Sequence, residues 1–243
     1  MPLKDTGPVR LISKSVKDYY KDMLFAQRLK QCYEIASPRI QQYLKAEIDH
    51  VLKKINPRDI VLELGCGYGR VLYHLAQKAS VAIGIDTSFS SLEMAKETIG
   101  DFSNCCLFNM DAVQLAFCNR VFDCVVCVQN GISAFHVDQQ DLIKESIRVT
   151  SQGGRVLLSS YSDRFWDERL EWFIAQSEAG LLGEIDYEKT QKGVIVCKDG
   201  FTAATMRASD FLMLTQGMDL CVKIEEVDGS SVFYEIITPR SER

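Results

Sequence analysis

The chain has 243 residues and a mass of 27.5 kDa; 47% of the residues are hydrophobic and 25% are charged. This composition is typical of a packed globular domain and excludes disordered, collagen-like and low-complexity proteins. The net charge of −5 gives no general attraction to nucleic acid, and no apolar run reaches the roughly 20 residues that cross a membrane.

The start of the sequence lacks the apolar centre of a signal peptide, and its nine cysteines are scattered and odd in number. Both features favour a cytoplasmic protein with reduced thiols. Cys124 and Cys127 form a C-x-x-C pair, but they lie in the apolar run VFDCVVCVQ. In a strand, residues three apart point to opposite faces, so we expect buried cysteines there and no metal site.

Residues 1–57 are predicted to form an N-terminal helical cap. In the stretch 37–57, Ser37 is a plausible N-cap, Pro38 occupies the first helical position, and apolar residues follow at helical spacing. Asn56 and Pro57 should end this helix, and an earlier helix is expected over about 14–31. Residues 1–56 carry 11 basic and 6 acidic side chains, an excess that a solvated helix face explains better than a nucleic-acid contact.

Residues 58–160 alternate short apolar runs with helical patterns, which indicates strand–helix–strand units. The expected helices lie near 69–79, 89–99 and 138–150, and the expected strands are 59–64, 80–86, 104–110, 121–129 and 154–161. Continuous apolar strands are typical of a buried parallel sheet. We therefore predict an α/β fold with a doubly wound sheet that binds ligands at the carboxyl ends of its strands.

Residues 161–243 should complete a single domain that spans 58–243, with a cofactor half at 58–160 and a substrate-side half at 161–243. An amphipathic helix over 162–180 precedes an alternating hairpin over 183–206, with its turn at 198–200. A short helix near 208–216 and a second hairpin, made of 219–227 and 231–237, should close the sheet edge. Helical spacing places Trp166, Trp172 and Phe173 in the core.

The run VLELGCGYGR, residues 61–70, is a strand that ends in glycines and opens a helix. Gly65 permits a tight turn, Gly67 lets a ligand approach the main chain, and Gly69 helps to present helix amides. The spacing is G-x-G-x-G, and Arg70 replaces the last glycine of a dinucleotide site. Glu63 stands two residues before the loop, which disfavours a pyrophosphate and favours an amine-bearing ligand.

Two further acids end the next two strands. Asp86 closes AIGID, where nucleoside-binding α/β folds place the carboxylate that accepts ribose hydroxyls, and Asp111 lies in NMDA. Each could alone be a helix-cap carboxylate. Because three acids and three glycines meet at successive strand ends, an uncharged or positive nucleoside is the ligand that the sequence predicts.

The motifs ELGCGYG, GIDTS, NMDA and FDCVVCVQN resemble those of the class I S-adenosylmethionine-dependent methyltransferases. The resemblance implies a mostly parallel seven-stranded sheet with a reversed last strand, and S-adenosylmethionine as cofactor. It further implies roles for individual residues. The methionine moiety would lie on Glu63, Gly65, Cys66, Gly67 and Gly69, the ribose on Asp86 and Thr87, the adenine on Asp111 and Ala112, and the amino group on Gln129.

Methyl transfer from a sulfonium needs an aligned acceptor more than a strong base. If a base exists, the loop QNGISAFHVDQQ should carry it, and His136 could take a proton, although a histidine at a helix start is the simpler interpretation. Tyr161 and Asn130 could orient the acceptor. Tyr19, Tyr20, Tyr33 and Arg39 could fold over the site and exclude water, or merely pack the cap on the body.

A small-molecule acceptor is the favoured partner, and no membrane partner is expected. Nucleic-acid amino-methyltransferases usually carry a proline-rich tetrapeptide after the fourth strand, where this chain has QNGI. Three alternatives stay open: a methyltransferase that acts on protein or RNA, a non-catalytic module that binds S-adenosylmethionine, and, least favoured by the glycine spacing, a nicotinamide oxidoreductase.

Overall fold

A seven-stranded sheet forms the centre of the computed structural model, which describes residue 19 and residues 23–239. The strand order is β3-β2-β1-β4-β5-β9-β8; the first five of these are parallel, and β9 runs antiparallel to both of its neighbours. The predicted α/β fold with a reversed last strand is confirmed. The strands are β1 (Ile60–Leu64), β2 (Val81–Asp86), β3 (Cys105–Asn109), β4 (Phe122–Cys127), β5 (Thr150–Tyr161), β8 (Cys221–Val227) and β9 (Ser231–Ile237).

Helices cover both faces of this sheet. One face packs against α3 (Pro38–Lys54), α4 (Arg70–Lys78) and α5 (Phe89–Ile99), and the other against α6 (Gly131–Ala134), α7 (Gln139–Val149) and α9 (Ala208–Thr215). Cys124 belongs to the first apolar core and Cys127 to the second, so the two cysteines point to opposite faces, as predicted. Within the described ranges, no helix is both long enough and apolar enough to cross a bilayer.

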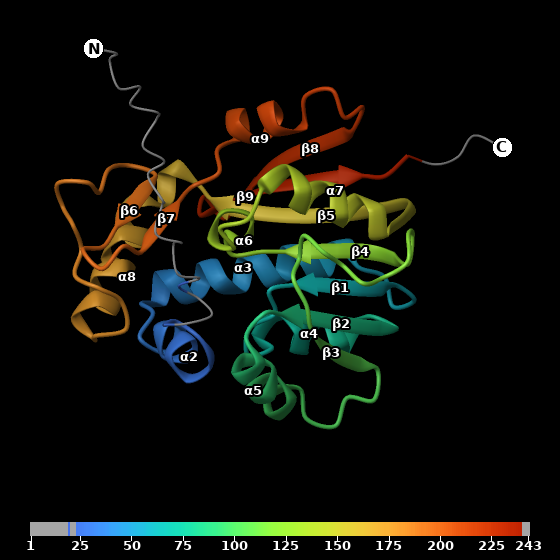
Figure 1. Cartoon of the computed structure of the whole chain (residues 1–243), viewed down its shortest axis with the longest axis horizontal. Coiled ribbons are helices and arrows are strands. Elements are labelled where there is room, and N and C mark those ends of the chain that lie inside the picture. Colours follow the sequence, from blue (N-terminus) through green and yellow to red (C-terminus); the bar gives the residue numbers. More distant parts are fainter. Residues whose placement is uncertain (1–18, 20–22, 240–243) are drawn as a thin grey trace, which may run out of the picture.

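A third apolar core lies beyond the sheet and joins distant parts of the chain. It combines α2 (Ala26–Glu34), the start of α3, the short 3-10 turn Asp163–Phe165, α8 (Trp166–Glu178) and the hairpin of β6 (Val194–Val196) and β7 (Thr202–Ala204). Figure 1 shows α2, α8, β6 and β7 together at one end of the molecule. We call this assembly the composite cap.

Two hydrogen bonds tie the N-terminal part of the composite cap to its later part. The Trp172 indole donates to the carbonyl of Cys32 at 2.8 Å, and the Tyr19 hydroxyl donates to the Asp199 carboxylate at 2.7 Å. The N-terminal segment and the segment after β5 therefore share one core. The predicted boundary between the N-terminal cap (1–57) and the rest of the chain therefore does not separate these two segments in space.

The predicted helix over 14–31 is interrupted. Tyr19 is helical, but Met23 and Leu24 form a turn and a bend and Phe25 is extended, so α2 begins only at Ala26 and continues to Glu34. The Ala26 amide donates to Ser91 Oγ of α5 at 3.1 Å, and this tertiary contact helps to fix where α2 starts. Residues 14–18 and 20–22 lie outside the described part. The predicted helices that became α3, α4, α5, α7, α8 and α9 are confirmed, as are both hairpins.

Candidate functional site

The glycine loop connects β1 to α4 at the carboxyl edge of the sheet. Gly65, Gly67 and Gly69 have φ angles of +67°, +53° and +86°, in the left-handed region that favours glycine. The Gly67 amide donates to the Asp86 carboxylate at 2.9 Å, so the end of β2 supports the loop. Gly69 packs against α5, where an added Cβ would lie 3.3 Å from that of Ala95. Gly65 and Gly67, by contrast, line a cavity.

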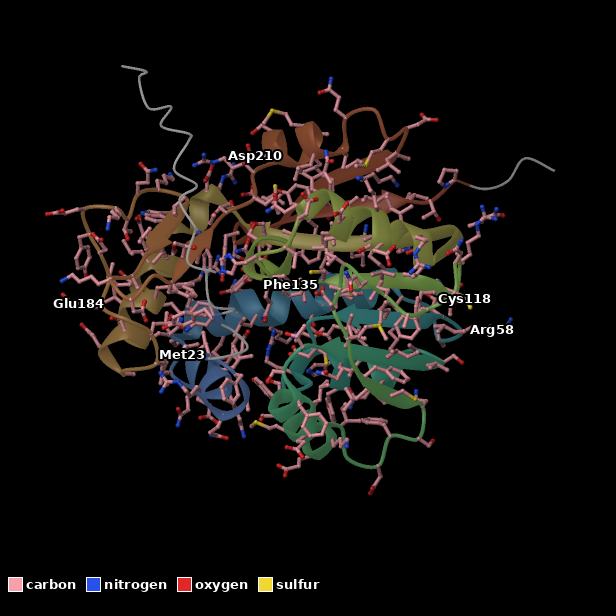
Figure 2. The ribbon with its side chains drawn as sticks, in the orientation of Figure 1. Met23, Arg58, Cys118, Phe135, Glu184 and Asp210 are labelled. Atoms are coloured by element: carbon pink, nitrogen blue, oxygen red, sulfur yellow. The ribbon has the colours of Figure 1, made fainter. Side chains whose placement is uncertain are left out.

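That cavity has a volume of about 190 Å³ and lies between the strand ends and the composite cap. Phe135, near the middle of Figure 2, extends into the same region. Its ring approaches the glycine loop so closely that an added Cβ at Gly65 would lie 2.4 Å from it. The absence of a side chain at Gly65 therefore leaves room for Phe135 over the loop.

Glu63 lies at the end of β1, behind the loop, and only 4% of it is exposed. Burial raises the pKa of this carboxyl to about 8, against the opposing effect of Arg70. Three polar atoms around a smaller cavity of about 40 Å³ are buried and have no hydrogen-bond partner among the described residues: Glu63 Oε2, Arg70 Nη2 and Gln129 Nε2. This cluster can receive a ligand that carries both a cationic and an anionic group.

The other two strand-end carboxylates face the main cavity. Asp86 accepts the amides of Gly67 and Ser88, at 2.9 and 2.8 Å. Asp111 is exposed and accepts the Val113 amide at 3.0 Å. Both carboxylates remain accessible to hydroxyl or amino groups of a ligand in the cavity.

The buried carboxylate of Glu47 forms a hydrogen bond with the segment that follows β4. Gln129 and Asn130 both adopt left-handed φ angles. The Gln129 amide donates to Glu47 Oε2 at 3.1 Å and to Ser159 Oγ at 2.9 Å, while the Tyr33 hydroxyl donates to Gln129 Oε1 at 2.8 Å. Burial raises the pKa of Glu47 to about 6. Gln129 is thus oriented by α3, β5 and α2 together.

The end of the cavity beneath the composite cap is aromatic. Tyr33, Tyr43, Tyr161, Trp172 and Phe173 line it, and Phe201 completes the wall. Burial raises the pKa of both the Tyr43 and Tyr161 hydroxyls, so they carry their protons at neutral pH. Trp172 and Phe173 belong to the third core, as predicted, but they also line the cavity.

The structure gathers most of the residues predicted to bind a cofactor. Gly65, Gly67, Asp86, Thr87, Asp111, Ala112 and Gln129 line the main cavity, and Glu63 and Cys66 line the smaller one. Tyr33 and Tyr161 also face the main cavity, whereas Gly69 does not line either one.

Other predicted residues lie elsewhere. His136 is exposed and absent from the lining, although its neighbours Phe135 and Val137 belong to it. Asn130 bonds to the Ala204 carbonyl at 2.9 Å, Arg39 pairs with Asp228 at 2.6 Å, and Tyr19 bonds to Asp199. Asn130, Arg39 and Tyr19 therefore hold loops and the composite cap together, whereas His136 faces the surface. Tyr20 lies outside the described residues.

Sequence reasoning assigned no role to Arg70, Tyr43, Phe135 or Gln176. Arg70 follows the third glycine directly, and its position at a helix start beside a ligand loop was the available signal. Tyr43 and Gln176 lie on helices of the composite cap, at spacing that indicates core residues only. Their place at the cavity depends on how that cap folds back over the sheet.

Comparisons with known proteins agree with this architecture. Residues 61–154 match the family model described as a methyltransferase domain. No curated protein matches the chain in sequence.

Several solved structures share the fold. The PH0226 protein of Pyrococcus horikoshii has 19% identity and a TM-score of 0.63, over 91% of this chain and 99% of its own. A SAM-dependent methyltransferase of Methanosarcina mazei has 17% identity and a TM-score of 0.58, over 79% and 97%. The protein of the DhpI–SAM–HEP complex has 17% identity and a TM-score of 0.58, over 90% and 94%.

Proposed function

We propose that this chain, which has the class I S-adenosylmethionine-dependent methyltransferase fold, methylates a small molecule bound between the glycine loop and the composite cap. The chain carries a methyltransferase domain, and S-adenosylmethionine is its cofactor. The proposal adds the class of acceptor and the roles of the residues around it.

The donor end of the site fits the cofactor in three respects. The glycine loop lines the cavity at Gly65 and Gly67, and at Gly67 no side chain stands between the main chain and a ligand. Glu63 and Gln129 offer unsatisfied oxygen and nitrogen atoms for the amino acid end of the molecule, and Arg70 offers a cation for its carboxylate. In this proposal Asp86, with Thr87, holds the ribose, and Asp111, with Ala112, holds the adenine.

When bound, the cofactor supplies an electrophilic methyl group: an acceptor lone pair forms the new bond to carbon as the carbon–sulfur bond breaks, and its electron pair stays on sulfur. The residues of this chain then contribute alignment and exclusion of water. Tyr161 acts as a protonated hydroxyl that orients the acceptor, because burial holds its pKa above the ordinary value. His136 stays a candidate for accepting the released proton only if the loop around Phe135 turns it inward.

The aromatic end of the cavity, covered by the composite cap, is the observation that carries the small-molecule proposal. Its walls come from α2, α3, α8 and the segment before β7, which together cover the carboxyl edge of the sheet. A side chain or base of a macromolecule would need an open groove to reach the donor methyl. The net charge of −5 also gives no general attraction to RNA. The N-terminal residues and the segment after β5 act in this proposal as one acceptor-binding part.

Incubation of the protein with methyl-labelled S-adenosylmethionine and a cell extract tests this proposal. Separation into metabolites, protein and RNA should place the label in the metabolite fraction. The Gly67→Val variant, which we expect not to bind the donor, is the negative control. Label in protein or RNA would show a macromolecular acceptor. Donor binding without any label transfer would show a non-catalytic binding module.

A further inference from the structure

One polar side chain lies at the aromatic end of the cavity without a hydrogen bond to another described side chain. Gln176, on α8, is only 3% exposed and lines the cavity. The Tyr43 hydroxyl, on α3, also lines this end, and it lies beside the Tyr161 hydroxyl. A buried polar group without a partner is unfavourable, so such groups commonly mark the position of a ligand atom.

The same end of the cavity offers no ionic partner among the described lining residues. None of them is a lysine, arginine or histidine, and the carboxylates among them, Asp86 and Asp111, stand at the strand ends. Cys32 lines this end, and burial raises the pKa of its thiol to about 12, so it carries no charge at neutral pH. An acceptor with a full negative charge would lose its hydration without meeting a cation at the wall.

An ammonium group is also disfavoured there. The Arg169 guanidinium lies over the Tyr161 ring, 4.1 Å from its centroid, and donates to the Ala203 carbonyl at 2.7 Å. One face of this ring is therefore already occupied by a positive charge. A second cation against the same ring would be repelled by the first.

The remaining wall is made of flat apolar surfaces. The ring centroids of Trp172 and Phe173 lie 5.9 Å apart, and those of Phe173 and Phe201 lie 6.0 Å apart. Such ring clusters accept a further aromatic ring edge-on or in offset stacking. The polar amide of Gln176 lies among them and can both donate and accept a hydrogen bond.

We propose that the acceptor is an uncharged aromatic molecule whose polar group forms a hydrogen bond with the Gln176 side-chain amide. This inference rests on the proposed function and specifies its substrate class. Gln176 would then determine specificity, because a ring without the polar group would leave the amide buried and unsatisfied.

Four probes with one ring system separate the possibilities: 2-naphthol, naphthalene, 2-naphthoate and 2-naphthylmethylammonium. Their dissociation constants are measured by equilibrium dialysis, with saturating S-adenosylhomocysteine and again without it. We expect 2-naphthol to bind at least tenfold more tightly than the other three, which corresponds to about 1.4 kcal/mol. In Gln176→Leu, 2-naphthol should bind no better than naphthalene. The Gln31→Leu variant, altered at an exposed glutamine of α2, should behave as the unaltered protein does.

Tighter binding of either charged probe would overturn the inference, as would a preference for 2-naphthol that survives in Gln176→Leu. Failure of all four probes to bind would overturn it as well. Binding of S-adenosylhomocysteine is measured separately in each variant. If the unaltered protein does not bind it, the proposed function is contradicted. The probe measurements made without S-adenosylhomocysteine would still test the role of Gln176.

Discussion

Glu63 shows how a single buried residue can link the fold to ligand binding. Its carboxyl has an unsatisfied oxygen, and burial raises its pKa to about 8, so at pH 7 it is mostly protonated. The ammonium group of a bound cofactor would favour the ionised form and lower this pKa. Glu63 therefore releases its proton to solvent when the ligand binds.

We therefore predict that S-adenosylmethionine binding at pH 7 releases close to one proton from Glu63. Calorimetric titrations in buffers of different ionisation enthalpy measure the number of protons released. The Glu63→Gln variant should bind more weakly and release none from this position. Binding heats of the unaltered protein that are identical in every buffer would contradict this role.

Gly67 should be essential for binding because of the space beside it. Its φ is +53°, and an added Cβ would lie 3.2 Å from Leu29 Cδ2 at the edge of the cavity. Gly229, in the turn between β8 and β9, has a similar φ of +62°, but nothing lies within 4 Å of the Cβ position. Gly67→Val and Gly229→Val both place a side chain at a positive φ, which costs about 1–2 kcal/mol. Only Gly67→Val should lose S-adenosylmethionine binding in the calorimeter; loss in both variants would show that strain alone is responsible.

The sequence predicted the loop and its acids well because local spacing determines them. The positions of Gly65, Gly67, Asp86 and Asp111 follow from successive strand ends of a parallel sheet. Gln176 could not be found in this way. It lies at helical spacing beside core residues, and only tertiary packing decides that its amide faces a cavity.

At the scale of elements, α2 is the part of the composite cap that contacts the donor end of the site. Leu29 approaches Gly67, and the Tyr33 hydroxyl bonds to Gln129, at the end of β4. The sequence predicted one helix over 14–31, whereas the chain has a break at 23–25 before α2 begins. The contact between Ala26 and Ser91 of α5 helps to fix its start, and no local pattern reports such a contact.

Tyr33→Phe should loosen this link between α2 and β4. A neutral hydrogen bond contributes about 0.5–1.5 kcal/mol, so we expect S-adenosylmethionine to bind roughly two- to tenfold more weakly. The dissociation constant is measured by calorimetry. Tyr187→Phe, at a side chain that is 65% exposed, is the matched control. Unchanged affinity in Tyr33→Phe would show that α2 does not orient Gln129 for the cofactor.

On the scale of the whole molecule, two buried acids make stability depend on pH. Burial raises the pKa of Glu47 to about 6 and that of Glu63 to about 8, from ordinary values near 4.5. Between pH 4.5 and pH 8 the folded state therefore binds more protons than the unfolded state. The free energy of unfolding contributed by these groups is fully present below pH 4.5 and is lost as pH rises toward 8.

We predict that Glu63→Gln loses less stability than the unaltered protein when pH is raised from 5 to 8. Urea unfolding at both pH values, without ligand, gives the free energies of unfolding. Subtracting the change in the free energy of unfolding of one protein from that of the other isolates the contribution of Glu63 from those of the other titrating groups. An equal or larger loss in the variant would mean that Glu63 is ionised in the folded protein throughout this range.

The parallel strands and both hairpins followed from periodicity and turn residues, and the reversed last strand from the family resemblance, whereas the composite cap followed from neither. Its defining contact joins Trp172 to Cys32, which are 140 positions apart in the chain. The sequence predicted a cap over 1–57 and a separate later insertion, because each has its own helical or alternating pattern. Their shared core, and with it the aromatic end of the cavity, emerges only from the packing of distant segments.

Isothermal calorimetry with S-adenosylmethionine, S-adenosylhomocysteine and NAD⁺ tests the central assignment most directly. We expect one binding site for each adenosyl compound, no heat with NAD⁺, and no binding of any of the three by Gly67→Val. Binding of NAD⁺ with no response to either adenosyl compound would contradict the assignment.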